Sequence, residues 1–150
     1  MRDMKNGFYI YDSASLIKPL HNMAVADGEK CRDLKTFVVL LAEKFSFPDY
    51  FSDNLDSLEE ILNDMSWLED NNFAIMISNY ADFLKSEKPS RKAALLSLFA
   101  ETASQWQHVP NYPGEEAYRD RADFRIYIER CPEAIEDLEE LDIPVQGYLG

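Results

Sequence analysis

Cysteine and histidine are scarce in this sequence, which has two of each. Cys31 and Cys131 lie far apart, no CxxC pair occurs, and the histidines are His21 and His108. A structural zinc site usually needs about four such ligands at short spacings, so we expect no metal site and no cofactor. Two lone cysteines are more typical of small buried side chains in a reducing compartment, which favours a cytoplasmic location.

Long apolar runs are also missing. No segment approaches the length of a membrane span, and residues 1–7 are polar, without the apolar core of a secretion signal. The sequence therefore gives no indication of membrane insertion or export.

Positive charge is in short supply. The chain has 15 Lys and Arg against 28 Asp and Glu, giving a net charge of −13 and a pI near 4.5. Such a surface repels phosphate backbones and anionic lipid headgroups, so we expect no direct binding to nucleic acid or membranes. It would attract a basic protein instead.

Apolar residues make up 46% of the 150 residues, enough for one domain with a hydrophobic core. Short apolar or alternating runs predict strands at Phe8–Tyr11, Met23–Ala26, Phe73–Ser78 and Phe124–Ile128. Apolar residues at helical spacing predict helices over about residues 34–45, 54–65 and 90–106. Strands separated by helices predict an α/β fold, with a small, mainly parallel sheet of about three or four strands covered by helices.

The composition changes after residue 130. Six acids crowd a short helical segment between residues 133 and 142, and Ile143–Leu149 could add an edge strand. We expect residues 1–130 to form the domain. Residues 131–150 would be an acidic extension, packed on that domain or trailing from it.

The acids are not spread evenly along the chain. From Phe45 through Leu84 there is no Lys or Arg, and nine acids occur. On a helix over residues 53–65, one face carries Leu55, Leu58, Ile61, Leu62 and Met65. A stripe nearly opposite carries Asp53, Asp56, Glu60 and Asp64.

That stripe is unfavourable for stability alone. Like charges at i, i+4, such as Asp56 and Glu60, cost about a few tenths of a kcal/mol each on an isolated helix. Asp64 also lies at the wrong end of the helix dipole. A merely solvated acidic face is the alternative, but the absence of basic residues on both flanks favours a site for a basic partner.

Aromatic residues frame the acidic helix. We expect Phe51 and Trp67 to pack the helix ends into the core, and Tyr50 to be the exposed contact. Aromatic anchors beside charged groups are the usual composition of a binding hot spot.

The segment FPDYFSDNLDSL (residues 47–58), followed by LNDMSW (residues 62–67), resembles the barstar family. The family pattern runs roughly F-P-x-Y-F-G-x-N-W-D-A-L, then D-x-x-L and D-L-x-W. Upstream, Met23–Glu29 resembles the first strand of the family and its turn, and the resemblance extends over about residues 8–129. The family consists of intracellular inhibitors that plug the active site of a ribonuclease, and of related immunity-like proteins.

The resemblance implies a layered α/β fold whose inhibitory surface is the second helix and the loop before it. By matching position, Tyr50, Asn54, Asp56 and Glu60 fall on family contact positions. Glu60 takes the place of the principal acidic residue, which is usually an aspartate. A later segment is similar to the last helix of the family and would make Glu101 a peripheral acidic contact.

Some positions depart from the family pattern. Ser52 replaces the usual glycine, Leu55 replaces a frequent tryptophan, and Glu59 stands where an aromatic contact occurs. These changes leave the fold expected but the identity of the nuclease open.

The predicted function is inhibition of a basic nuclease, a ribonuclease toxin, by a monomer that forms a 1:1 complex. The predicted partner-binding residues are Tyr50, Asp53, Asn54, Asp56, Glu60, Asp64 and Glu101. One alternative is a non-inhibitory acidic module for another basic partner. The other is an enzyme with Asp56 and Glu60 as paired carboxylates, or with an activated thiol at Cys31. The absence of a nucleophile–base pair and a glycine-rich phosphate loop argues against catalysis, so we predict no catalytic residues.

Overall fold

The computed structural model describes residues 6–13, 17, 22–47, 55–64, 72–107 and 123–149. Five strands form one sheet in the order β2-β3-β4-β1-β5, and all neighbouring strands are parallel. The strands are β1 (Gly7–Tyr11), β2 (Asn22–Asp27), β3 (Asn72–Ser78), β4 (Asp123–Glu129) and β5 (Val145–Leu149). The predicted α/β class with a parallel sheet is confirmed. The sheet has one strand more than the three or four expected for the domain, and that strand is β5 of the C-terminal extension.

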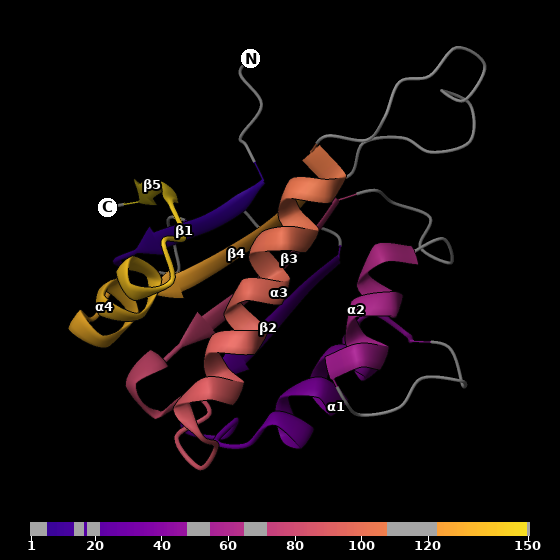
Figure 1. Cartoon of the computed structure of the whole chain (residues 1–150), viewed down its shortest axis with the longest axis horizontal. Coiled ribbons are helices and arrows are strands. Elements are labelled where there is room, and N and C mark those ends of the chain that lie inside the picture. The colour runs from indigo at the N-terminus through magenta and orange to yellow at the C-terminus, as the bar shows by residue number, and fades with distance from the viewer. Residues whose placement is uncertain are drawn as a thin grey trace.

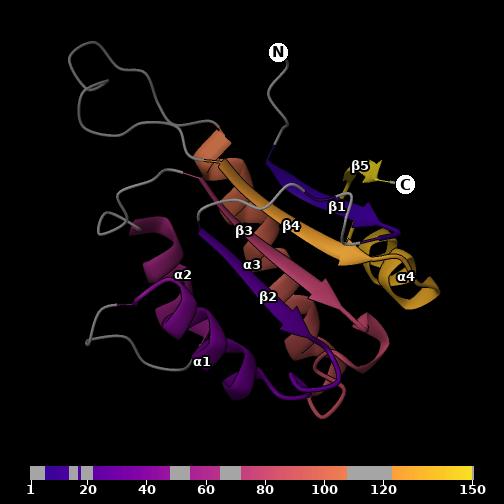
Figure 2. The same ribbon diagram turned by 180° about the vertical axis from the view of Figure 1, so that it is seen from behind.

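The helices are α1 (Leu34–Lys44), α2 (Leu55–Asp64), α3 (Pro89–Gln107) and α4 (Pro132–Glu140), with a short 3-10 turn η2 (Tyr80–Asp82). In Figure 1 α3 lies in front of the strands, and in Figure 2, seen from behind, the strands lie in front of α3. The long helix α3 therefore covers one face of the sheet. In both views α2 and α4 lie on opposite sides of α3.

Successive side chains along a strand point to opposite faces of the sheet, and this explains why the helices pack on one face. Phe8 and Ile10 of β1 belong to the main core with the buried faces of the four helices. Tyr9 and Tyr11 point to the other face, where they pack with Tyr127 of β4. All five residues of β1 are buried, as expected for a strand with neighbours on both sides.

The first helix shows how local sequence sets an element. Leu34, Phe37 and Leu41 recur at helical spacing and are buried against the sheet. The side chain of Asp33 caps the helix by accepting a hydrogen bond from the Thr36 amide, at 2.8 Å. The chain leaves the helix through Ser46, whose φ of +54° is the left-handed conformation common after a helix.

The C-terminal segment, α4 and β5, is part of the same sheet and hydrophobic core. Strand β5 pairs with β1, which confirms the predicted edge strand at Ile143–Leu149. Ala134 and Leu138 of α4 lie in the main core. The first strand of the chain thus sits between β4 and the last strand. That residues 1–130 form a unit separable from 131–150 stays a prediction.

Candidate partner-binding site

Helix α2 presents two opposite faces. Leu58, Ile61 and Leu62 are fully buried in the core, at i, i+3 and i+4. Asp56 and Glu60 are exposed and stand one helical turn apart. The predicted division of this helix into an apolar inner face and an acidic outer face is therefore observed at the positions whose side chains are described.

The neighbouring helix α3 holds α2 in place. The indole Nε1 of the buried Trp106 donates a hydrogen bond to the backbone carbonyl of Leu62, at 2.8 Å. Leu62 is among the last four residues of α2, whose carbonyl groups have no amide partner within the helix. The position of α2, and with it the position of its exposed acids, is held by contacts within the protein. Such preorganisation lowers the entropic cost of binding a partner.

Two exposed carboxylates of α2 have no cationic partner among the described residues. Neither Asp56 nor Glu60 forms an ion pair with any residue that the structure describes. The last turn of the helix carries no basic residue to offset its dipole. A cationic surface brought against this face would meet carboxylates that are not already neutralised.

The other predicted contact residues are placed less completely. Glu101 is exposed on α3, the helix that packs against α2. Asp64 is the last residue of α2, and its side chain lies outside the description. Tyr50, Asp53 and Asn54 lie outside the described residues, as do Phe51, Ser52 and Trp67.

Cys31 has the character of a structural residue. Cys31 and Cys131 are both free thiols, and Cys31 is 1% exposed. Burial raises the pKa of the Cys31 thiol, and the nearby Asp27 and Asp33 raise it further. A nucleophilic cysteine requires a lowered pKa, so the activated-thiol alternative is not supported.

The described part of the chain shows neither a metal-binding cluster nor a membrane-spanning helix. Within it, no three His, Cys, Asp or Glu side chains come together in a way that could hold a metal ion. None of its helices has the length and apolarity that crossing a bilayer requires.

Comparison with known proteins identifies the family. No curated protein matches the chain in a sequence search. A family model described as Barstar (barnase inhibitor) matches residues 21–129. The match includes β2, β3 and β4 with α1, α2 and α3, whereas β1, α4 and β5 lie outside it. Because the model matches well over half of the sequence, the chain belongs to the Barstar family.

Proposed function

We propose that this protein binds a basic nuclease, a ribonuclease toxin, and blocks it by placing α2 in the active site. The observation that carries the proposal is the two-faced α2, with Leu58 buried and Asp56 and Glu60 exposed and unpaired among the described residues. The family description, that of an inhibitor and not of an enzyme, supports it.

The mechanism is electrostatic mimicry of a nucleic acid. A nuclease cleft carries basic side chains that hold phosphate. Carboxylates on a rigid helix can accept charge-assisted hydrogen bonds from those same donors. Because α2 is fixed by its buried face and by Trp106, little ordering is needed when it binds.

Long-range charge sets the rate of encounter. The net charge of −13 and the absence of Lys and Arg from residue 45 through residue 84 attract a basic surface before contact. Dissolved salt screens this attraction over a distance of about 8–10 Å at physiological ionic strength. Association should therefore slow strongly as salt is added.

The contact surface in this proposal comprises Tyr50, Asp53, Asn54, Asp56, Glu60, Asp64 and Glu101, and Glu60 is its central residue. Glu60 is selected twice, by its place on the exposed face of α2 and by its match to the main acidic position of the family. We also propose a monomer in a 1:1 complex in the cytoplasm, where free thiols such as Cys31 and Cys131 stay reduced.

The test is titration of the protein into barnase and a panel of other basic ribonucleases and deoxyribonucleases. The result expected is complete inhibition of at least one ribonuclease at one equivalent, with an association rate that falls steeply between low and high salt. Binding to a basic protein without loss of nuclease activity would favour the non-inhibitory module. A salt-independent association rate would contradict the steering argument.

A further inference from the structure

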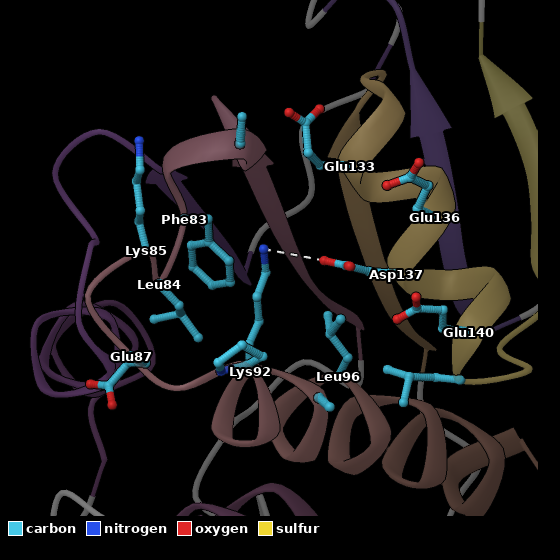
Figure 3. A pocket seen from close by; sticks show the side chains of 14 residues that line it. Phe83, Leu84, Lys85, Glu87, Lys92, Leu96, Glu133, Glu136, Asp137 and Glu140 are labelled. Atoms are coloured by element: carbon cyan, nitrogen blue, oxygen red, sulfur yellow. Dashed lines mark ion pairs between the residues drawn. The ribbon is translucent and has the colours of Figure 1, made fainter.

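A cavity of about 310 Å³ opens between η2, the N-terminal part of α3 and α4 (Figure 3). Its lining includes residues of α3 and α4 but none of α2, and α2 and α4 lie on opposite sides of α3 (Figures 1 and 2). One of its walls is α4, which lies beyond the residues matched by the family model. The cavity is therefore a feature separate from the proposed inhibitory face.

One wall of the cavity is a row of carboxylates. Glu133, Glu136, Asp137 and Glu140 all line it, at the i, i+3, i+4 and i+7 spacing of a single helical face. Ala134 of the same helix is buried in the core. The rest of the lining combines the charged side chains of Lys85, Glu87 and Lys92 with apolar residues, which are Ala81, Phe83, Leu84, Pro89, Ala93, Leu96 and Leu141.

This wall already holds one cation of the chain itself. The ammonium Nζ of Lys92 lies 3.2 Å from an Asp137 carboxylate oxygen and 4.0 Å from the centre of the Tyr80 ring. The Tyr80 hydroxyl donates a hydrogen bond to the same carboxylate, at 2.8 Å. A carboxylate beside an aromatic face is a suitable environment for an organic cation.

The remaining acids of the wall differ from Asp137 in their pairing. Among the described residues, Glu133, Glu136 and Glu140 form no ion pair. The nearby cation of Lys85 is paired with Asp82, at 3.8 Å. The lining of the cavity therefore carries more negative than positive charge, beside its apolar side chains.

The charge pattern of α4 does not favour the helix itself. Glu136 and Glu140 are like charges at i, i+4, and Glu140 stands at the C-terminal end, where the helix dipole disfavours an acid. The last turn contains no basic residue. An added positive charge at this wall would relieve both effects.

We propose that this cavity is a second docking site, which takes an arginine side chain flanked by apolar residues from a partner protein. The volume is at the lower end of the range for small-molecule sites, about 300–1,000 Å³, and suits one long side chain. The aliphatic stem of arginine packs on the apolar lining while its planar guanidinium reaches two carboxylates. Glu136 and Glu140 are the acids placed to receive it.

The experiment is a heteronuclear NMR titration of the full chain with the peptide acetyl-Leu-Arg-Leu-amide. Amide shifts should concentrate on η2, the first turns of α3 and α4. In the double variant Glu136→Gln/Glu140→Gln the dissociation constant should rise about fivefold, as expected for the loss of two solvent-exposed charge contacts. Glu139→Gln is the matched control, because Glu139 is exposed on the same helix and does not line the cavity.

Several results would overturn the proposal. These are an absence of shifts at the highest soluble peptide concentration, equal weakening in Glu139→Gln, or equal binding of the peptide with neutral citrulline in place of arginine. Agmatine alone binding as tightly as the peptide would assign the cavity to a small cation instead. Glu60→Ala should leave peptide binding unchanged. The proposal for the cavity and the proposed function of α2 are therefore tested independently.

Discussion

The indole nitrogen of Trp106 donates a hydrogen bond to the backbone carbonyl oxygen of Leu62, across 2.8 Å. The two residues are 44 positions apart, and their contact joins the end of α3 to the last turn of α2. The position of the acidic helix thus depends on a side chain that carries no charge and is itself buried.

Trp106→Phe should destabilise the protein. The variant keeps an aromatic ring but leaves the Leu62 carbonyl without its donor, which typically costs about 1–3 kcal/mol for a buried group. Urea unfolding followed by far-ultraviolet circular dichroism measures the change, with the exposed neighbour Gln105→Ala as control. Equal stability of Trp106→Phe and Gln105→Ala would show that the hydrogen bond does not support α2.

Leu58→Ala should lower stability, because Leu58 is fully buried beneath the acidic face. Truncation of a buried leucine to alanine costs about 2–5 kcal/mol through lost apolar burial and the cavity left behind. Thermal melting of the two variants Leu58→Ala and Glu60→Ala tests the difference between the faces of the helix. Glu60→Ala should keep the stability of the parent or raise it slightly, because it removes like-charge repulsion. Comparable losses in the two variants would contradict the two-faced description.

Gly28→Ala should be among the most damaging single changes. A Cβ atom at residue 28 would lie 2.0 Å from the backbone oxygen of Asn79, and backbone atoms there cannot yield easily. The expected loss is about 3 kcal/mol or more, at or beyond the upper end of usual overpacking costs. Gly147→Ala is the matched control, because its Cβ would meet only the edge of the Tyr9 ring, at 3.2 Å. Similar melting temperatures for the two variants would argue against this close contact.

Tyr11 should make the protein sensitive to alkali. Burial, with a smaller effect from the charge of Glu129, raises the pKa of Tyr11 from 10.0 to about 12. Because the folded state holds the phenolic proton more tightly, this contribution to stability is complete below pH 10 and is lost as the pH rises towards 12. Unfolding free energies across this interval should fall more steeply for the parent than for Tyr11→Phe. Parallel curves would show that Tyr11 is not the group responsible.

The local elements were predictable from the sequence, because their signals are local. The apolar spacing that runs through Leu58, Ile61 and Leu62 predicted both α2 and its inner face, and the structure buries all three side chains. The run at Phe8–Tyr11 likewise predicted β1.

The order of the strands in the sheet was harder to predict from the sequence, because it depends on contacts between distant segments. No local pattern indicates that β1 lies between β4 and β5, an order that joins the first and last strands of the described residues in one sheet. The cavity beside α4 also could not be predicted, because it too is formed by segments that are distant in the sequence. The spacing of Glu133, Glu136, Asp137 and Glu140 can be read from the sequence as one helical face, but the pairing of Lys92 with Asp137 requires α3 and α4 to be neighbours.

In the proposed complex, Glu60 makes the principal contact with the nuclease. The direct measurement compares the inhibition constants of Glu60→Ala and Glu139→Ala against the nuclease that the parent protein inhibits most tightly. Both variants lose one exposed acid, but Glu139 lies on α4. Glu60→Ala should weaken inhibition by about 2–5 kcal/mol, a range that rests partly on the barnase–barstar pair of this same family, while Glu139→Ala should inhibit like the parent. If Glu60→Ala inhibits as tightly as the parent and Glu139→Ala do, the proposed site is wrong.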